Sequence, residues 1–394
     1  MAKKLLIIGA SILQLPAIKK SKEAGYYTVV ADFNPKAIGI PYSDEFHCVS
    51  TIDVDGITKL AEDIRPDGIM TLATDMPMRA LAAATSKLGL PGITFDTAIK
   101  STDKGEMIKA FEEHGVEHPW YYIVDDEEQF NAIVEKVTYP CVMKPTDNAG
   151  NRGVCYCASK VELLKEYAYS HENSRSGHVI IEEYMAGEEV SVEIVVYKGK
   201  VHILAVTDKS TLGKPYFVEI GHAEQSQKSA ETVAAIKDLA TRAVKAVGID
   251  NSPAHVEIMV TKDGPKMVEL GSRMGGGCIT THLVPLSTGI DMIRSVMDLA
   301  LSIEPDLEPK FDKGSALRHI VGVEGIIETV EGLDDARKVP GVIEVTMLKN
   351  VGDECHYFKN GADRVGYVIA QGKDTAEAIA ICEEAMKKIN IKTN

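Results

Sequence analysis

No hydrophobic run in this 394-residue sequence is long enough to cross a membrane or to form the apolar centre of a secretion signal. A membrane helix needs about 20 consecutive apolar residues, and the first apolar run, Leu5–Ile8, is far shorter. A run of that length fits a buried parallel strand instead. We therefore expect no membrane partner, and we expect the protein to act in the cytoplasm.

Positive charge is in short supply. Lysine and arginine number 43 against 58 aspartates and glutamates, which gives a formal net charge of −15 at pH 7. A surface with this excess of negative charge repels nucleic acid and anionic membranes, so neither is an expected partner. An anionic small molecule is not excluded, because a local basic site that bears a metal ion can bind it.

The motifs of several common sites are missing. Among the seven cysteines, Cys155 and Cys157 form a close pair without a second pair at zinc spacing, so we interpret all of them as reduced thiols. There is no G-K-[ST] sequence of a Walker A loop, and the turn Gly9–Ser11 after the first predicted strand lacks the G-x-G-x-x-G fingerprint. Asp32 ends the second predicted strand as a ribose-binding acid would, but alone it is weak evidence for a nicotinamide site.

Short apolar strands alternate with helices through about the first hundred residues. This alternation predicts a parallel sheet that helices cover on both faces. The predicted strands are Lys4–Ile8, Thr28–Ala31, Phe46–Val49, Gly68–Thr71 and Gly92–Thr94, and the predicted helices are Ile12–Ala24, Val54–Ile64 and Met78–Leu88.

The rest of the chain has a different pattern. Its middle part contains alternating β-branched runs, which favour an antiparallel sheet mixed with helices. Pro305 and Pro309 interrupt a polar stretch and indicate a boundary. The later predicted elements are a helix that ends at Gly248, three strands and a final helix, namely Val233–Val247, His319–Val323, Val342–Leu348, Val365–Ala370 and Thr375–Ile389.

Two glutamates and an arginine form the most informative pattern. Glu257 and Glu269 each lie in a predicted strand with apolar neighbours, and Arg273 follows the second glutamate by four positions. Two carboxylates suit Mg²⁺ that bridges nucleotide phosphates, and an arginine beside them can neutralise a transferring phosphoryl group. The alternative is a plain hairpin with two glutamates on a solvated face.

A lysine at the end of an apolar strand precedes a polar loop that contains glycines. Lys144 closes the run Cys141–Pro145, and the loop 147–153 follows, with Asn148, Gly150 and Gly153. Backbone N–H groups of such a loop can close over phosphates while the lysine adds a point charge. An ordinary hairpin loop with a surface lysine is the alternative.

An acidic segment comes next. Glu182 ends a predicted strand, the backbone of Glu183, Tyr184 and Met185 can offer hydrogen bonds to an adenine edge, and Glu189 can accept hydrogen bonds from ribose hydroxyls. Such a segment is unremarkable by itself.

The order of these motifs resembles that of the ATP-grasp superfamily. The similar segments are S-T-D-K-G-E-M-I-K-A-F-E-E-H-G-V (Ser101–Val116) with Lys104, C-V-M-K-P (Cys141–Pro145), I-I-E-E-Y-M-A-G-E-E-V-S-V-E (Ile180–Glu193) and V-E-L-G-S-R (Val268–Arg273). The resemblance covers nearly the whole chain. It implies that ATP is bound by Lys104, Lys144, Asn148, Gly150, Gly153, Glu182–Met185 and Glu189, with Mg²⁺ or Mn²⁺ on Glu257 and Glu269.

One position departs from the family pattern, and the sequence after it resembles one branch of the family. Gly271 stands where many members have an asparagine that helps to hold a second magnesium ion, so the sequence does not decide whether a second metal ion binds. Arg273–Asp291 and Asp363–Gly372 are similar to L-amino-acid ligases, glycinamide ribonucleotide synthetase and short relatives of the carbamoyl-phosphate synthetase large chain. This resemblance places Gly276, Gly277 and His222 near the substrates, although a flexible turn and a structural histidine are the alternatives.

The resemblance implies an α/β protein with three parts. These are a doubly wound parallel-sheet domain in residues 1–97, a two-lobed ATP-grasp domain in 98–304 and a small α+β domain in 305–394. It also implies that a carboxylate is activated as an acyl phosphate and joined to an amine, with Lys144 and Arg273 offsetting charge. A phosphoribosylamine–glycine ligase and a nucleotide sensor without catalysis are the alternatives, and a homodimer stays open.

The N-terminal domain is expected to contribute to the substrate pocket. Gly9–Ser11, Asp32–Asn34 and Thr74–Asp75 follow predicted parallel strands, and ligands bind outside the carboxyl ends of such strands. Turn formation and helix capping explain Ser11 and Asn34 equally well. Asp75 is the acid that we expect to bind an ammonium or hydroxyl group of the substrate.

Overall fold

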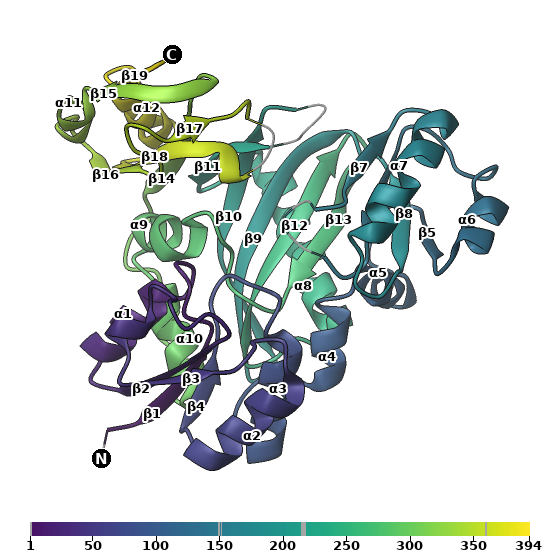
Figure 1. The fold of residues 1–394 in the computed structure, drawn as a ribbon, viewed down its shortest axis with the longest axis horizontal. Helices are drawn as coiled ribbons and strands as arrows, with labels where there is room; N and C mark the ends of the chain where they lie inside the picture. Colours follow the sequence, from purple (N-terminus) through teal and green to yellow (C-terminus); the bar gives the residue numbers. More distant parts are fainter. Residues whose placement is uncertain (1, 149, 151, 214–217, 359–360) are drawn as a thin grey trace.

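The structure is a computed structural model that describes residues 2–148, 150, 152–213, 218–358 and 361–394. A long antiparallel sheet crosses the middle of the molecule, with the N-terminal domain below it, a small lobe on one side and the C-terminal strands at the other end (Figure 1). None of the described helices is both long enough and apolar enough to span a membrane.

The N-terminal sheet is parallel, in the order β3-β2-β1-β4. Alternate residues of its strands point to opposite faces. Leu6 and Ile8 of β1 pack with the helices α2 and α3, whereas Leu5 and Ile7 pack with α1 and with α10 from much later in the chain. The elements are β1 (Lys4–Ile8), β2 (Tyr27–Asp32), β3 (Glu45–Cys48), β4 (Gly68–Met70), α1 (Leu15–Glu23), α2 (Val54–Ile64), α3 (Met78–Leu88) and α10 (Met292–Ala300).

The strands β1 to β4 and the helices α1 to α3 lie where the sequence predicted them, within three residues at each end, except in one place. Gly92–Thr94 is not a strand. The backbone at Gly92 lies against α3, where an added Cβ atom would be 2.8 Å from Thr85 Oγ1, and Thr94 instead caps α4 (Phe95–Lys100) by accepting from the Thr97 N–H. Helix α4 spans the boundary that we expected between residues 97 and 98.

The central sheet has eight strands and is continuous from the middle of the chain to its C-terminal part. Its order is β13-β12-β9-β10-β11-β14-β18-β16, and all of these pairings are antiparallel. The expected antiparallel character is therefore confirmed, and the last three strands extend the sheet beyond residue 305. The strands are β9 (Gly187–Tyr197), β10 (Lys200–Thr211), β11 (Glu219–Glu224), β12 (Ser252–Thr261), β13 (Gly264–Gly271), β14 (Gly314–Val321), β16 (Val342–Met347) and β18 (Arg364–Gly372).

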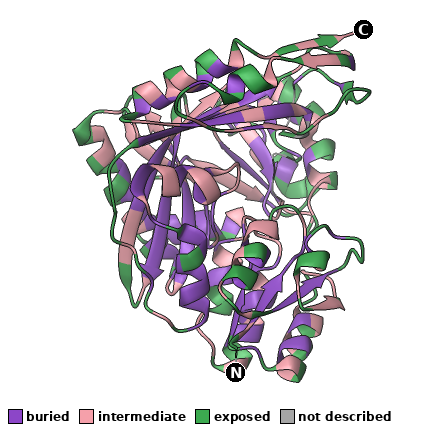
Figure 2. Cartoon of the chain, turned by 90° about the vertical axis from the view of Figure 1, so that its left-hand side faces the viewer, coloured by how far each residue is buried: buried purple, intermediate pink, exposed green. Residues whose placement is uncertain are grey.

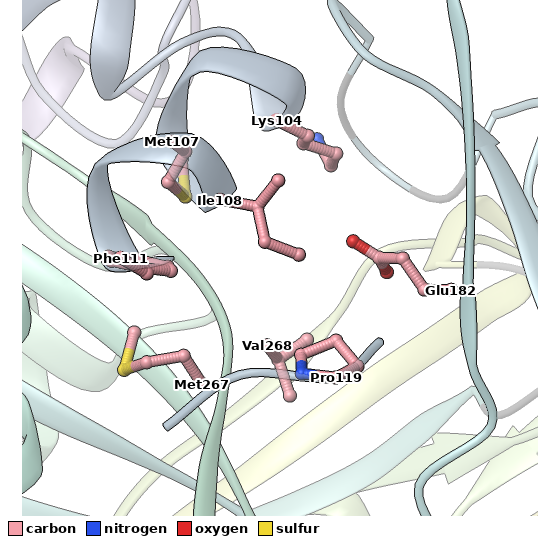
Figure 3. A pocket seen from close by; sticks show the side chains of 8 residues that line it. All are labelled: Lys104, Met107, Ile108, Phe111, Pro119, Glu182, Met267 and Val268. Carbon is pink, nitrogen blue, oxygen red and sulfur yellow. The ribbon is translucent and has the colours of Figure 1, made fainter. Parts of the chain in front are cut away.

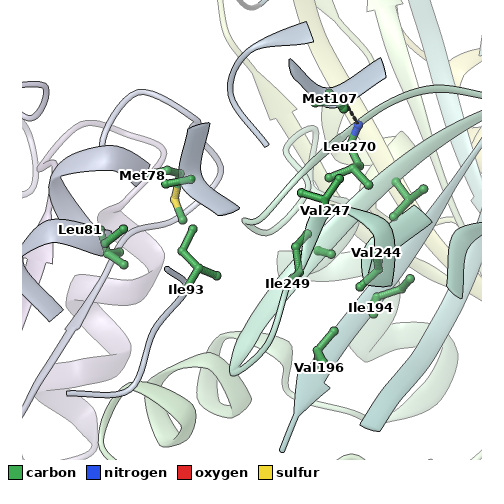
Figure 4. Close-up of a cluster of buried hydrophobic side chains, with 14 of the residues drawn as sticks. Met78, Leu81, Ile93, Met107, Ile194, Val196, Val244, Val247, Ile249 and Leu270 are labelled. Carbon is green, nitrogen blue, oxygen red and sulfur yellow. Dashed lines mark hydrogen bonds between the residues drawn. The ribbon is translucent and has the colours of Figure 1, made fainter. Parts of the chain in front are cut away.

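One face of this sheet is apolar. Val192, Ile194 and Val256 pack there against α8 (Ala230–Val247), which Ser229 caps and Gly248 ends in a left-handed conformation. The same cluster continues into the N-terminal domain through Met78, Leu81 and Ile93 (Figure 4). The strands of the sheet are largely buried, and the outer faces of the surrounding helices are exposed (Figure 2).

The other face of the sheet is polar, as its register shows. Residues directly opposite in neighbouring strands point to the same side. Glu269 is opposite Glu257, His255 is opposite Glu193, Lys209 is opposite His222, and His319 is opposite Tyr367. We call this side the polar face, and its members are Glu269, Glu257, His255, Glu193, Ser191, Thr207, Lys209, His222, Glu224, Leu317, His319, Tyr367, Thr346 and Glu344.

The small lobe and the C-terminal layer complete the fold. The lobe is a sheet in the order β5-β8-β6-β7 with two helices, and it joins the central sheet through α5 (Lys104–Glu113). The elements are β5 (Tyr121–Val124), β6 (Cys141–Pro145), β7 (Cys155–Cys157), β8 (Val179–Glu183), α6 (Glu127–Ile133), α7 (Lys160–Glu172), α9 (Val284–Thr288), β15 (Gly325–Glu331), β17 (Glu354–Cys355), β19 (Asn390–Thr393), α11 (Leu333–Arg337) and α12 (Thr375–Met386).

Candidate active site

Lys144 and Glu182 form a buried ion pair between the neighbouring strands β6 and β8. The Lys144 Nζ atom lies 2.7 Å from Glu182 Oε2, and each side chain is 8% exposed. Burial alone would lower the pKa of Lys144, but Glu182 and then Glu269 outweigh it and raise the pKa above its usual value. Lys144 therefore stays charged at the junction of the two sheets, as a phosphate-binding lysine must.

Lys104 approaches the same junction from the first turn of α5. Asp103 caps this helix by accepting from the N–H groups of Gly105 and Glu106. The Lys104 Nζ atom lies 3.2 Å from Glu269 Oε2 and donates to the carbonyl oxygen of Asn148 at 2.9 Å. The two lysines that the sequence predicted thus meet the same group of carboxylates.

A recess opens beside this pair of lysines. Lys104 and Glu182 lie at one side of it, and the other side is apolar, with side chains from α5 and β13 (Figure 3). Its lining is Lys104, Met107, Ile108, Phe111, Pro119, Glu182, Met267 and Val268. An apolar wall beside two charged groups is the composition expected where a flat base and its phosphates bind together.

The loop 147–153 is partly anchored. The Asn148 amide donates to the carbonyl oxygen of Asn173, just after α7, at 2.8 Å. Gly150 and Gly153 have positive φ angles of 70° and 78°, and a Cβ atom at Gly153 would lie 2.6 Å from the Pro145 ring. Residues 149 and 151 lie outside the described residues, so closure of this loop over phosphates stays a prediction.

The backbone N–H groups and the side chains at the end of β8 mostly bind within the protein. The Glu183 N–H donates to the Trp120 carbonyl at 2.9 Å, and its carboxylate pairs with Lys266. The Tyr184 ring packs edge-on against Tyr156 at 5.0 Å between centroids. The Tyr184 N–H donates weakly to the Pro140 carbonyl oxygen at 3.4 Å. Because the N–H groups of Glu183 and Tyr184 already bond within the protein, Met185 is the residue of this segment whose N–H best suits an adenine edge.

Glu257 and Glu269 lie directly opposite each other on β12 and β13. His255 holds the first of them, because its Nε2 atom is 3.2 Å from Glu257 Oε1 and its Nδ1 atom is 2.8 Å from Glu193 Oε1. Burial works against a charged imidazole, but these carboxylates raise the pKa of His255 to about 9. The ring is therefore a cation that donates to both acids at pH 7.

Lys209 is the main site residue that the sequence analysis missed. Its Nζ atom lies 2.6 Å from Glu189, 3.2 Å from Glu219 and 2.7 Å from Glu257, and its side chain is 2% exposed. Burial opposes the charge, but the three carboxylates raise its pKa well above the usual value. Glu189, expected at the ribose, is thus linked through one ammonium group to Glu257, which we expect to bind the metal.

Arg273 and Asp75 form a two-pronged ion pair across the two domains. Arg273 Nε and Nη2 lie 2.9 and 3.0 Å from the two Asp75 carboxylate oxygens. Burial is outweighed by Asp75, and the pKa of Arg273 is raised. A Cβ atom at Gly271 would lie 2.6 Å from Asp75 Oδ1, so this pair fills the space that a side chain at position 271 would need.

The partner of Asp75 changes how its role is interpreted. We expected its carboxylate to bind an ammonium or hydroxyl group of a substrate, whereas the structure gives it a guanidinium partner. A recess borders Arg273 and lies between the N-terminal domain and the central sheet, with Thr71, Met78, Ile93 and Ser272 in its lining. Asp75 is placed to orient Arg273 at this recess.

The other loops at the edge of the parallel sheet bind each other. Asp32 accepts from the N–H groups of Ala10 at 2.7 Å and Asn34 at 2.8 Å. The Ser11 hydroxyl donates to Gln14 Oε1, and the Asn34 side-chain oxygen Oδ1 accepts from the Lys36 N–H. The turn-forming explanation therefore holds for Ser11 and Asn34, and the carboxylate of Asp32 is used inside the protein.

The glycine segment after Arg273 runs over the polar face. A Cβ atom at Gly275 would lie 2.6 Å from His255 Nδ1, and one at Gly277 would lie 3.1 Å from His222 Nε2, whereas one at Gly276 would meet no atom within 4 Å. Gly276 thus borders open space, while its neighbours touch the sheet. His222 is 1% exposed and lies beneath this segment.

The carboxylates fit a metal that also has ligands outside the protein. Within the described ranges, no three His, Cys, Asp or Glu side chains are arranged to enclose a metal ion. Glu257 and Glu269 supply two hard oxygen donors next to Lys104 and Lys144, a set that suits Mg²⁺ completed by phosphate oxygens and water.

Comparison with protein families identifies the domains. Residues 137–282 match the model of an ATP-grasp domain, and residues 319–394 match the L-amino acid ligase C-terminal domain 2. The first match includes Lys144, Glu182, Glu257, Glu269 and Arg273. The fold is therefore that of an ATP-grasp protein, as the sequence resemblance implied.

Individual relatives give the same result. Alanine–anticapsin ligase of Bacillus subtilis is 25% identical over 74% of this chain and 66% of its own length. A formate-dependent phosphoribosylglycinamide formyltransferase of Sulfurisphaera tokodaii is 26% identical over 96% of this chain and 94% of its own. The fold is similar to that of L-amino acid ligase from Bacillus licheniformis, with a TM-score of 0.85, 24% identity and coverage of 100% and 99% of the two chains.

Residues 137–282 thus form an ATP-grasp domain, and residues 319–394 match the C-terminal domain of L-amino acid ligases. The chain spans 63% and 66% of the length of the first two curated relatives that it matches. Structures of this fold have been determined with ADP, in one case as the magnesium salt.

Proposed function

We propose that the protein joins a small carboxylate to an amine, with ATP as the energy source and an acyl phosphate as the intermediate. The observation that carries the proposal is the meeting of Lys104, Lys144, Glu257 and Glu269 at the junction of the small lobe and the central sheet. Two cationic side chains and two carboxylates at one point are the groups that position a phosphoryl donor and its metal.

ATP and Mg²⁺ fit these residues. The recess beside Lys104 has an apolar wall for the base, and Lys104 and Lys144 supply the positive charge that phosphates need. Mg²⁺ on Glu257 and Glu269 would neutralise charge on the phosphate oxygens. No ligand is needed to keep these groups in place, because every one of them already has an opposite charge beside it, and binding exchanges one set of partners for another.

The carboxylate substrate fits the recess that borders Arg273. Apolar side chains from the N-terminal domain, such as Met78 and Ile93, line one wall, and the guanidinium of Arg273 lies at the edge. Asp75 holds that guanidinium in a fixed orientation, so that it faces the transferring phosphoryl group with little loss of side-chain freedom. This arrangement supports our expectation that the N-terminal domain contributes to the acyl-substrate pocket.

The chemistry needs positioning more than a protein nucleophile. The substrate carboxylate attacks the γ-phosphate, ADP leaves, and the amine then displaces phosphate from the acyl phosphate to form the amide. Lys144 and Arg273 offset negative charge during the first step. Closure of the loop 147–153 would exclude water, which otherwise hydrolyses the intermediate.

The test is release of ADP that requires both substrates. Pairs of amino acids, and phosphoribosylamine with glycine, would be screened with Mg-ATP, and the products identified by mass spectrometry. We expect ADP and an amide only when an acid and an amine are both present, and we propose that the reaction takes place in the cytoplasm. Tight ATP binding with no turnover for any pair would identify a nucleotide sensor, and turnover of phosphoribosylamine alone among the amines would identify the purine ligase.

A matched control separates this activity from contamination. Glu257→Gln removes one charged metal ligand and should lose turnover, whereas Glu324→Gln changes an exposed glutamate outside the site and should leave it unchanged. The oligomeric state, for which a homodimer is one possibility, would be measured on the same preparation by light scattering.

A further inference from the structure

Cys278, His282 and Glu344 form a cluster at the edge strand of the central sheet that the proposed reaction does not use. Cys278 directly precedes a single turn of π-helix, Ile279–Leu283, that leads into α9. The His282 N–H donates to the Cys278 carbonyl oxygen at 3.0 Å, so the two residues lie one turn apart, with their side chains on the same side. Glu344 reaches His282 from β16, with 3.4 Å between Oε2 and Nε2.

The imidazole of His282 is a cation between the thiol and the carboxylate. Its hydrogen bond with the Cys278 thiol, followed by that with Glu344, raises the pKa of His282 to about 9, although burial opposes the charge. The hydrogen bond with His282 is also the main reason why the pKa of Glu344 is lowered, to about 2. Glu344 in turn accepts from the Tyr367 hydroxyl at 2.8 Å. At pH 7 a charged imidazole is therefore held against a thiol by a carboxylate that is itself fixed.

The surroundings of Cys278 differ from those of the other cysteines. Five are buried, namely Cys141, Cys155, Cys157, Cys355 and Cys382. Cys48 is exposed, and its Sγ atom faces the Phe33 carbonyl oxygen at 3.6 Å. Cys278 is half-buried, and the side chains of His282 and Glu344 beside it are each 33% exposed. Reactive cysteines are partly exposed and lie next to positive charge, whereas buried ones are inert, and Cys278 meets both conditions.

The backbone of Cys278 is strained. Its φ and ψ angles are 62° and 5°, in the left-handed region that residues with a Cβ atom avoid. Strain of this kind persists only where the surrounding structure holds it, and it gathers at functional sites. A glycine would fit this position with less strain, as Gly277 before it does with a φ of 58°, yet the chain places a thiol there.

We propose that Cys278 is a nucleophilic thiol that low-molecular-weight disulfides convert to a mixed disulfide, with His282 as the residue that positions it and Glu344 as the residue that orients His282. The Cys278 sulfur attacks one sulfur of the disulfide R–S–S–R. The bond between Sγ and that sulfur forms while the S–S bond of the reagent breaks, and the other half leaves as a thiolate that takes up the proton of the Cys278 thiol. Cys278 is oxidised and one half of the reagent is reduced, so no further oxidant is needed.

The experiment measures the rate of modification at each cysteine, which does not depend on ligase activity. The folded protein would be incubated at pH 7 with glutathione disulfide or with cystamine, and the adducts at Cys278 and Cys48 would be quantified over time by mass spectrometry of acid-quenched digests. The two reagents carry opposite charges, so a preference that both share reports on the thiol. Cys48 is the internal reference, because it is the more exposed of the two cysteines.

The chain offers a matched control for the imidazole. His47 and Glu45 form a similar pair at 2.7 Å, with side chains 31% and 34% exposed, and Cys48 follows His47 directly. Because successive side chains of a strand point to opposite faces, the His47 ring faces away from the Cys48 thiol. His282→Gln and His47→Gln therefore remove equivalent rings, of which only the first lies against a thiol. His282→Lys keeps a positive charge, and Glu344→Gln keeps the ring but removes the charge that orients it.

We expect Cys278 to react faster than Cys48 by on the order of 10-fold with both reagents, and we expect a thiol reductant to reverse the modification. In urea, where the fold is lost, the two cysteines should react alike. His282→Gln should remove the advantage of Cys278, His282→Lys should keep part of it, Glu344→Gln should reduce it a few-fold, and His47→Gln should change neither rate.

Thermal unfolding would verify that each variant is folded. An unchanged rate at Cys278 in folded His282→Gln would overturn the role of the imidazole. The comparison within the parent protein needs no variant: if Cys48 reacts as fast as Cys278 with either reagent, or if Cys278 keeps its advantage in urea, the cluster does not activate this thiol and the proposal is wrong.

Discussion

A Lys209→Met substitution removes one buried ammonium group and leaves the carboxylates of Glu189, Glu219 and Glu257 facing one another. Methionine keeps most of the length and the apolar stem of lysine, so the change is one of charge. Breaking a buried ion pair by removing one partner costs about 3–5 kcal/mol, because the other charge stays buried without compensation.

The pKa of Glu219 gives a second view of the magnitude. Burial raises this pKa, but His222, Lys209 and Arg364 outweigh it and lower the value from 4.5 to about 2. Since a tenfold change in equilibrium is worth about 1.4 kcal/mol, the charged carboxylate is stabilised by about 3 kcal/mol, of which Lys209 supplies part. Because Lys209 supplies only part of this stabilisation, the estimate for Lys209→Met rests on the lost buried ion pairs, and we expect the free energy of unfolding to fall by about 3 kcal/mol at pH 7.

The pH dependence provides an internal check. In the parent, the folded pKa of Glu219 is below its unfolded value, so its stabilising contribution is present above about pH 4.5 and is lost as the pH falls toward 2. Without Lys209, burial should raise the carboxylate pKa values above their unfolded values. The carboxylates of the variant would then take up protons as the pH falls, which reduces their repulsion. The difference in the free energy of unfolding between the parent and the variant should therefore be smaller at pH 5 than at pH 7.

Urea unfolding followed by circular dichroism at pH 7 and pH 5 measures both quantities. Lys59→Met is the control, since Lys59 and Asp63 form an ion pair with side chains 76% and 62% exposed, and such pairs contribute less than about 1 kcal/mol. A loss below about 1 kcal/mol for Lys209→Met at pH 7, or a deficit that grows toward pH 5, would show that this charge arrangement is wrong.

Four further substitutions test the phosphate end of the site and the recess that borders Arg273. Glu269→Gln should lower kcat by on the order of 10²-fold with the fold intact, and near-normal turnover at saturating Mg²⁺ would remove it from the metal site. Lys144→Ala should raise the apparent KM for ATP and lower the chemical rate, whereas Lys104→Ala should mainly weaken nucleotide binding. If calorimetry shows that both variants bind ATP with the parental affinity, the nucleotide site is misplaced. Asp75→Asn should alter KM or preference for the carboxylate substrate and leave ATP affinity unchanged, because Arg273 loses the carboxylate that orients it. Kinetics equal to the parent's on every substrate would contradict this role of Asp75.

Local patterns were enough to predict much of the fold. The strand β1 and the helices α2 and α3 have the predicted bounds, because period-two and period-3.6 apolar patterns, caps and glycines are signals within a few residues of each element. The opposite placement of Glu257 and Glu269 follows from the hairpin between two adjacent strands. The family resemblance supplied the order of the site motifs.

Contacts between distant strands could not be predicted in the same way. Lys209 meets carboxylates from β9, β11 and β12, and the three separations are set by sheet order, for which one sequence gives no direct signal. Asp75 and Arg273 are 198 residues apart and come together only where two domains meet. The sequence does indicate one of these contacts, between His255 and Glu257. His255 precedes Glu257 by two residues in a strand and therefore lies on the same face.

The glycines after Arg273 allow a final prediction about how closely the chain approaches the polar face. A Cβ atom at Gly275 would lie 2.6 Å from His255 Nδ1 and 3.0 Å from Glu193 Oε2, so Gly275→Ala must displace the histidine that holds Glu257. At Gly276 an added Cβ atom would meet nothing within 4 Å.

The two alanine substitutions therefore differ in one contact. Gly275→Ala should cost about 1–3 kcal/mol of stability, the usual penalty for overpacking, and should raise the Mg²⁺ concentration needed for half-maximal activity, because Glu257 loses its donor. Gly276→Ala should unfold at the parental temperature and change only KM for a substrate that lies against it. Equal stability of both variants, or a Mg²⁺ requirement in Gly275→Ala equal to the parent's, would mean that the segment is not held against the sheet, and that His255 does not position the metal-binding carboxylate.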